Sequence, residues 1–191
     1  MYFYSRIASM SEKTTQTRTY WWILISVAAV TFVLDQITKW LVVRHLAYGE
    51  TWVFWSALSG IFDITYTRNT GAAFGVGQGQ GNIFLVIAIV VSAIIIFSYR
   101  QLPQGSWPVR ISMGMMMGGA LGNAMDRIRF GYVVDFFHLH GWPIFNIADS
   151  AIVCGVLFWM ISAWWAERQQ VHENIVADAS TDEIKRIPST D

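Results

Sequence analysis

The sequence predicts an all-α membrane protein with four transmembrane helices and a small β-sheet on the outer surface. Hydrophobic residues make up 54% of the 191-residue chain and charged residues only 14%, whereas a soluble domain has about 25% charged residues. The mean hydropathy is +0.39. Four separate apolar segments are each close to the roughly 20 residues that a spanning helix needs.

The four apolar segments define one membrane domain, which leaves a short segment at each end of the chain. They cover residues 20–43, 82–99, 109–127 and 146–166. We expect one four-helix transmembrane domain over residues 20–166, a cytoplasmic N-terminal segment over 1–19 and a polar cytoplasmic tail over 167–191. Neither end has an apolar pattern, so both are predicted to be disordered. No small-residue cleavage site follows the first segment, which we expect to be retained, and Met10 is an alternative to Met1 as the start.

Net charge and cysteine content exclude some classes of function. The formal net charge is zero, which gives no indication of a nucleic-acid partner, and Cys154 is the only cysteine. A membrane dithiol oxidoreductase needs cysteine pairs, so that class is disfavoured. Cys154 lies in the apolar run AIVCGVLFW and is expected to be a small packing residue.

The third segment carries glycines at four-residue spacing. Gly114, Gly118 and Gly122 form a repeated small-xxx-small face, which allows close helix packing in lipid. General tolerance of glycine in membrane helices is the alternative explanation.

Positive charges predict the orientation of the spans. Lysine and arginine gather in residues 1–19, beside the loop after the second segment, and in the tail, so both termini are expected in the cytoplasm. Residues 44–81 and 128–145 then form two outer connections. Residues 62–67 are rich in β-branched and aromatic types and predict a strand of a small sheet at the membrane surface.

The acidic residues converge at one depth. Residues 20–166 contain six acids, which are Asp35, Glu50, Asp63, Asp126, Asp135 and Asp149. At about 1.5 Å per helical residue, Asp35, Asp126 and Asp149 lie toward the outer ends of their helices. Asp135 is in an outer connection. Ionisable residues inside a membrane are costly and indicate function by default.

Each polar group also has a structural explanation. Asp35 and Lys39 share a helix face and are compatible with an interfacial ion pair. Asp126 and its neighbour Arg127 are compatible with a helix-end anchor. Asn146 and Asp149 have the spacing of a capping box, which on sequence alone is favoured over catalysis for that pair.

Other chemistries fit the sequence less well. His138 and His140 share a strand face, but neither an HExxH motif nor a cysteine pair accompanies them, so interfacial histidines are favoured over a metal site. Ser150 lacks the G-x-S-x-G context of a serine hydrolase. A proton-conducting carrier needs polar residues along a pore, which the inner halves of the segments lack. A purely structural membrane scaffold is the third alternative.

Four sequence blocks resemble a known family. DQITKW, RNTGAAFG, GGALGNAMDRIRFGYVVDFF and WPIFNIADSAI, spread over residues 35–152, are similar to the motifs of lipoprotein signal peptidase, bacterial signal peptidase II. The resemblance implies an intramembrane aspartic peptidase of the bacterial inner membrane, with its active site near the outer face. This family cleaves signal peptides from diacylglyceryl-modified prolipoproteins just before the lipidated cysteine, needs no metal or organic cofactor, and is inhibited by cyclic depsipeptides of the globomycin type.

The resemblance also implies residue roles. The catalytic pair matches Asp135 and Asp149. It implies a short half-helix over the site and a sheet cradle. The remaining motif residues match the substrate-binding or site-supporting positions Asp35, Lys39, Asn69, Gly71, Ala73, Asn123, Asp126, Arg127 and Asn146.

We assign expected tasks to these supporting residues. Asn69 and Arg127 are expected to hold substrate carbonyls. Asn123 and Asn146 are expected to orient the aspartates. Asp126 is expected to fix Arg127, and the Asp35–Lys39 pair to brace the first helix.

Overall fold

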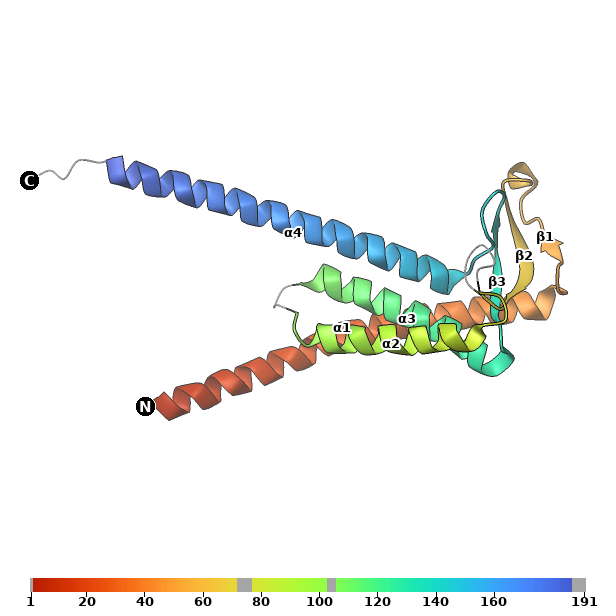
Figure 1. The fold of residues 1–191 in the computed structure, drawn as a ribbon, viewed down its shortest axis with the longest axis horizontal. Helices are drawn as coiled ribbons and strands as arrows, with labels where there is room; N and C mark the ends of the chain where they lie inside the picture. The colour runs from red at the N-terminus through yellow and green to blue at the C-terminus, as the bar shows by residue number, and fades with distance from the viewer. Residues whose placement is uncertain (1, 72–76, 103–105, 187–191) are drawn as a thin grey trace, which may run out of the picture.

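The fold is a bundle of four helices with a three-stranded sheet at one end, described by a computed structural model (Figure 1). The structure describes residues 2–71, 77–102 and 106–186, and side chains for 20–71, 77–102 and 106–171. The elements in chain order are α1 (Tyr2–His45), β1 (Thr51–Trp52), the 3-10 helix η1 (Ser56–Leu58), β2 (Phe62–Asn69), α2 (Gly81–Tyr99), α3 (Trp107–Phe130), β3 (Val133–Leu139) and α4 (Ile147–Arg186).

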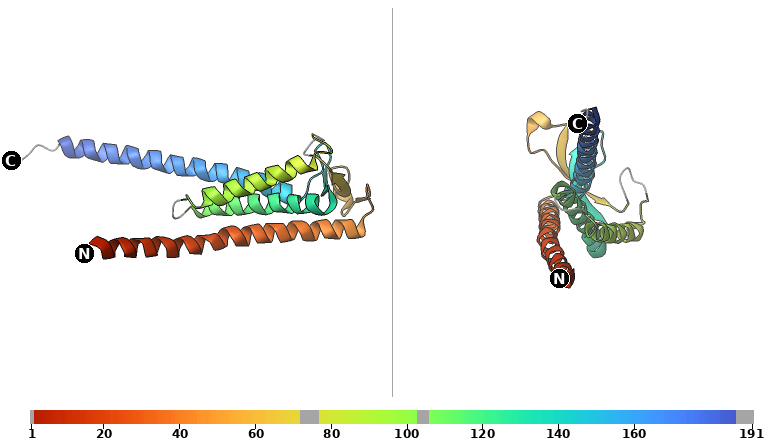
Figure 2. Two further views of the ribbon diagram at one scale, coloured as in Figure 1. Left: turned by 60° about the horizontal axis from the view of Figure 1, so that its bottom comes forward. Right: turned by 90° about the vertical axis from the view of Figure 1, so that its left-hand side faces the viewer.

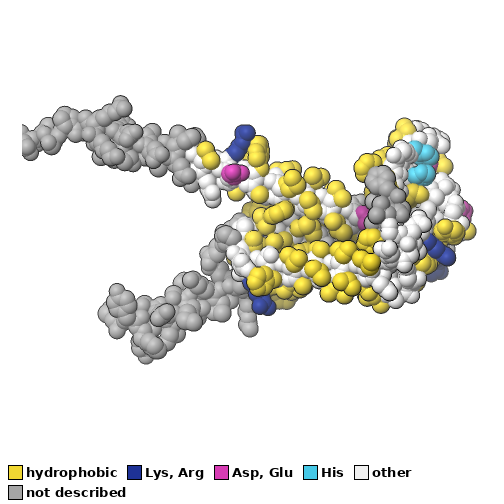
Figure 3. Space-filling model, viewed as in Figure 1, with side chains coloured by type: hydrophobic (Ala, Val, Ile, Leu, Met, Phe, Trp, Pro, Cys, Tyr) yellow, Lys and Arg dark blue, Asp and Glu magenta, His cyan; other side chains and the backbone are white. Residues whose placement is uncertain are grey.

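Three of these helices are long and apolar enough to cross a membrane. Within the described residues the candidate spans are Tyr20–His45, Gly81–Tyr99 and Ile147–Val171. Hydrophobic side chains cover the middle of the visible face, and charged ones gather toward its two ends (Figure 3). The remaining predicted span, residues 109–127, corresponds to α3, whose glycine and polar residues lower its hydropathy. It packs against α1, α2 and α4, so it needs fewer apolar side chains facing lipid.

The two chain ends differ from the sequence prediction. They were expected to be disordered, but α1 begins at Tyr2 and α4 continues to Arg186. Extending a helix that has already formed requires no new nucleus. Residues 167–186 also contain many good helix formers such as Ala, Glu, Gln and Arg. Both ends of the chain lie at the end of the bundle opposite the sheet (Figure 2).

Glycines on α3 allow its neighbours to approach closely, as the small-residue spacing predicts. A Cβ at Gly114 would overlap Val27 of α1, and one at Gly118 would overlap Ala28 and Thr31. A Cβ at Gly119 would instead overlap the Ala148 carbonyl oxygen of α4. Close packing of α3 against two helices is therefore why these positions carry no side chain.

The sheet is antiparallel in the order β1-β2-β3. The predicted strand over 62–67 is confirmed as β2, which pairs Thr67 with Asp135 and Asn69 with Val133 of β3. One face of the sheet forms a small core with the end of α1, composed of Val42, Tyr66, Val134 and Phe136. The described part of the first outer connection also holds the single turn η1, and the expected short half-helix over the site stays a prediction.

Candidate active site

Asp135 lies in the middle of β3 with its carboxyl group buried, at 2% exposure. Asn146 Nδ2 donates to Asp135 Oδ1 at 2.7 Å, and Asn69 Nδ2 donates to Oδ2 at 2.9 Å. Each oxygen therefore has an amide donor, which compensates in part for the loss of water.

Asp149 lies in the first turn of α4. Its backbone N–H donates to Asn146 Oδ1 at 2.9 Å, and Asn146 N–H donates to Asp149 Oδ2 at 3.2 Å. This reciprocal pair is a capping box, so the capping geometry expected from the spacing is confirmed. The other oxygen, Oδ1, accepts a bond of 2.8 Å from Asn123 Nδ2. Asp149 is therefore positioned by its own helix and by α3.

Asn146 joins the two aspartates. Its side chain is completely buried, and it contacts Asp135 through Nδ2 while capping α4 through Oδ1. Burial, and the nearby charge of Asp149, raise the pKa of Asp135 to about 7. The Asp135 carboxyl group is therefore protonated for part of the time near neutral pH.

A buried ionic cluster lies directly behind the aspartates. Lys39 Nζ is 2.9 Å from Asp35 Oδ2 and 3.0 Å from Asp126 Oδ2, and all three residues are at most 3% exposed. Lys39 also donates to Asn123 Oδ1 at 2.9 Å. The ion pair along α1 is thus internal rather than interfacial. Asp126, expected to fix Arg127, instead binds Lys39 and the Val134 N–H.

The cluster also supports the start of α4. Asp35 Oδ1 accepts a bond of 2.9 Å from the Ala148 N–H, which is one of the unpaired donors in the first turn of that helix. Gln36 was missed by the sequence analysis, although it is a polar residue next to Asp35 within an apolar segment. Its Nε2 donates to Asp35 Oδ2, Asp126 Oδ1 and the Gly122 carbonyl.

Arg127 holds the backbone just after β2. Its NH2 group donates to the Gly71 carbonyl at 2.9 Å, and Gly71 N–H donates to Asn69 Oδ1 at 2.9 Å. The Asn69 side chain thus bonds both Asp135 and Gly71, and its expected contact with a substrate carbonyl stays a prediction. Arg127 Nε is buried without a hydrogen-bond partner. Ala73 lies outside the described residues.

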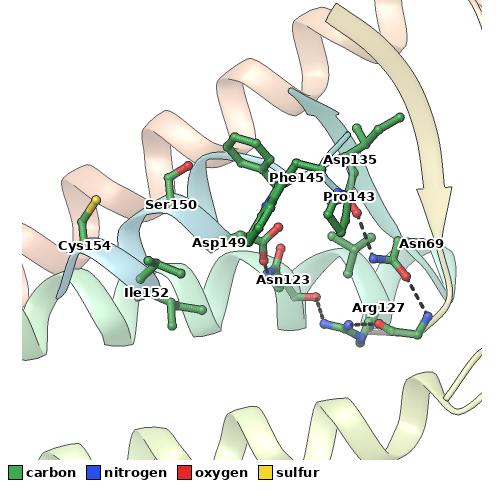
Figure 4. A pocket seen from close by; sticks show the side chains of 15 residues that line it. Asn69, Asn123, Arg127, Asp135, Pro143, Phe145, Asp149, Ser150, Ile152 and Cys154 are labelled. Atoms are coloured by element: carbon green, nitrogen blue, oxygen red, sulfur yellow. Dashed lines mark hydrogen bonds between the residues drawn. The ribbon is translucent and has the colours of Figure 1, made fainter. Parts of the chain in front are cut away.

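These side chains border a pocket of about 560 Å³. Figure 4 shows Asp135 and Asp149 on neighbouring elements, with Asn123 and Arg127 beneath them and Ile152 and Cys154 farther along α4. The pocket is lined by Asn69, Gly71, Asn123, Arg127, Val133, Asp135, Trp142, Pro143, Ile144, Phe145, Asp149, Ser150, Ile152, Val153 and Cys154. Polar groups gather at one end of the pocket and apolar side chains form the rest. Such a lining suits a ligand that has a polar group next to a hydrocarbon chain.

The two histidines lie outside this pocket. Their rings stack with centroids 4.3 Å apart, and His140 Nε2 is 2.8 Å from Asp63 Oδ2. Within the described part of the chain, no group of three or more His, Cys, Asp or Glu side chains is arranged to hold a metal ion.

Comparisons with known proteins agree on one family. The family model described as signal peptidase (SPase) II matches residues 27–165. The lipoprotein signal peptidase of Halothermothrix orenii is 41% identical over 143 residues, covering 74% of this chain and 95% of that protein. The lipoprotein signal peptidase of Geobacillus kaustophilus is 40% identical over 142 residues, covering 72% of this chain and 88% of that protein.

A solved structure has a similar fold. It is described as a bacterial membrane enzyme determined by the in meso method at 2.3 Å resolution, and it matches with a TM-score of 0.69 at 30% identity. The match covers 74% of this chain and 87% of that one. The family match spans the membrane helices, the sheet and both aspartates, and so this chain belongs to the signal peptidase II family.

Proposed function

We propose that this chain is an aspartic endopeptidase that removes signal peptides from diacylglyceryl-modified prolipoproteins, cutting just before the lipidated cysteine. Asp135 and Asp149 are the catalytic pair. The observation that carries the proposal is that two carboxyl groups from different elements, joined by Asn146, meet at the polar end of an apolar pocket. Relatives at about 40% identity that carry the name lipoprotein signal peptidase support the substrate class.

The chemistry needs one proton on the pair. Two carboxylates that share one site do not both ionise readily, so such a dyad shares a proton. The raised pKa of Asp135, to about 7, supports this state at neutral pH. The ionised carboxylate takes a proton from water as that water attacks the peptide carbonyl. The protonated carboxyl group donates to the carbonyl oxygen, and a proton then passes to the leaving amine.

The supporting residues hold this pair rather than react. Asn69, Asn123 and Asn146 each donate to a carboxylate oxygen, which fixes the orientation of both groups. Arg127 and Gly71 position Asn69 through the loop after β2. Part of the apolar lining, Ile152, Val153 and Cys154, belongs to α4, a candidate span, so the acyl chains of the substrate lie beside these residues in lipid.

The same geometry supports a membrane topology. We propose that α3 is a fourth span, so that both termini lie in the cytoplasm and the sheet lies on the outer side of the bacterial inner membrane. Both chain ends at one end of the bundle support an even number of crossings (Figure 1). The site is then near the outer face, where cyclic depsipeptides of the globomycin type bind as inhibitors.

A cleavage assay on the purified chain tests the proposal. Asp135→Asn and Asp149→Asn are expected to abolish cleavage of a diacylglyceryl prolipoprotein while leaving a folded protein. Asp63→Asn is the matched control, because Asp63 is also a buried acid at 4% exposure but pairs with His140 outside the pocket. It is expected to retain activity. Full activity in either dyad variant, or equal cleavage of a substrate without the diacylglyceryl group, would contradict the proposal.

A further inference from the structure

A second cavity lies between the end of α1 and the sheet, and it shares no lining residue with the peptidase pocket. Asp135 of β3 borders the peptidase pocket, whereas the next two residues, Phe136 and Phe137, border this second cavity. We call it the sheet groove; its volume is about 640 Å³. It is lined by Thr38, Leu41, Val42, His45, Leu46, Glu50, Thr51, Trp52, Ile64, Phe136 and Phe137.

The sheet groove lies beside the end of a candidate membrane span. Its helical wall is the last two turns of α1, and the candidate span in that helix ends at His45. Leu41 is 41% exposed and Trp52 58% exposed, so apolar surface remains open beside the span. Lipid chains surround such a helix, and a groove that opens onto its outer end is accessible to them.

The rim of the groove offers hydrogen-bond acceptors. Glu50 Oε2 accepts the Ala47 N–H at 2.7 Å, and the carboxylate makes no ion pair among the described residues. His45 Nδ1 contacts the Leu41 carbonyl at 2.8 Å, and a carbonyl only accepts, so Nδ1 carries the hydrogen. In the neutral ring, Nε2 is then an acceptor. A carboxylate and an imidazole acceptor complement a primary ammonium group, which has three donors and a positive charge.

We propose that the sheet groove binds one phospholipid with a primary ammonium headgroup, with an acyl chain between α1 and the sheet and the ammonium against Glu50 and His45. The bound chain contacts Phe136 and Phe137 of the strand that carries Asp135. Phe137 packs against Phe145 of the peptidase pocket, with ring centroids 5.5 Å apart. The lipid thereby stabilises this strand from behind. This site lies beyond the proposed peptidase function and does not depend on it.

The test uses the full chain purified in detergent and stripped of lipid. Dioleoyl phosphatidylethanolamine or dioleoyl phosphatidylglycerol is added, retained lipid is counted by native mass spectrometry, and the Tm is measured. We expect one retained phosphatidylethanolamine and a rise in Tm of roughly 3 °C or more, because a ligand bound only to the folded state stabilises it. Phosphatidylglycerol, which lacks the ammonium, is expected to be retained at least fivefold less.

Two variants locate the site. Leu41→Trp fills the groove and is expected to abolish retention, whereas Ile37→Trp, one turn away at a position that is 50% exposed and outside the groove lining, should not. Glu50→Gln keeps an oxygen for the Ala47 N–H but removes the charge. This variant is expected to retain phosphatidylethanolamine and phosphatidylglycerol in equal amounts.

Three results would overturn the proposal. They are equal retention of both lipids by the unmodified chain, equal effects of the two tryptophan variants, and displacement of the lipid by a diacylglyceryl peptide, which would assign the groove to the substrate. Peptidase activity is not used as a readout, so the outcome is independent of the catalytic assignment.

Discussion

Removal of the Lys39 charge tests the buried ionic cluster most directly. The ammonium group lies within 3.0 Å of one oxygen from each of Asp35 and Asp126, at 3% exposure. Lys39→Met keeps an unbranched apolar stem and leaves two buried carboxylates without their cation. Loss of one partner from a buried pair costs about 3–5 kcal/mol. At roughly 2–4 °C per kcal/mol for a chain of this size, we expect the Tm to fall by about 6–20 °C.

A second variant separates the ionic cause from simple loss of packing. Asp35→Asn combined with Lys39→Met leaves only one unpaired carboxylate, and is expected to recover about 1 kcal/mol or more relative to Lys39→Met alone. Thermal unfolding in detergent, followed by intrinsic fluorescence, measures both changes. A Tm within 2 °C of the parent for Lys39→Met, or a double variant less stable than the single, would refute the reasoning.

The same substitution has a catalytic consequence. Lys39 has only donors, so it requires the oxygen of the Asn123 amide to face it, and this leaves Nδ2 for Asp149. Without the ammonium, only the 3.1 Å bond from Asn146 Nδ2 keeps the Asn123 oxygen in place, so the amide holds the aspartate less firmly. The folded fraction of Lys39→Met is therefore expected to lose roughly tenfold or more in kcat with a smaller change in KM, because orientation matters at the transition state. An unchanged kcat per folded molecule would show that Lys39 acts on stability alone.

Three further predictions concern the site. Because burial raises the pKa of Asp135 to about 7, the cleavage rate is expected to fall about tenfold per pH unit above pH 7. Folding favours the neutral carboxyl group, so the Tm is also expected to fall as the pH rises from about 4 to 7. Asp135→Asn is expected to flatten this dependence of the Tm on pH. Gly122→Ala is expected to cost about 1–3 kcal/mol in thermal unfolding, because the new Cβ lies 3.1 Å from Asp35 Cγ, whereas Leu121→Ala at an exposed position serves as control. Arg127→Lys is expected to lower kcat/KM roughly tenfold in the cleavage assay, because one ammonium does not span the two carbonyls that the guanidinium binds.

The helical framework was predictable because its signals are local. Apolar length located all four bundle helices, and the β-branched run over 62–67 located β2. The two-residue strand β1 was not predicted, since Thr51–Trp52 is too short to show a period and forms only by pairing with β2. The helical ends were also missed, because polar composition indicates solubility but not whether an existing helix continues.

The sequence predicts the depth in the membrane at which the acidic residues lie, but not which residues they pair with. Rise per residue brings Asp35, Asp126 and Asp149 to one level, and the structure gathers them there with Asp135. Spacing along one helix reports only neighbours on that helix, so it suggested that Asp126 fixes Arg127. The actual partner, Lys39, comes from α1 because α3 approaches that helix closely at its glycines. Which charges pair across a bundle is decided by such packing and is absent from any local pattern.

Capping and catalysis need not compete at Asp149. One carboxylate oxygen completes the capping box with Asn146, and the other is held by Asn123, so the same bonds that begin α4 also orient the acid. An asparagine at this position has a single oxygen and retains only one of these two acceptor bonds. Asp149→Asn should therefore lose some stability even if the residue is catalytic, and a lower Tm alone does not favour capping. Only activity per folded molecule separates the two roles, because a cap restores activity when folding is restored and a catalytic carboxylate does not.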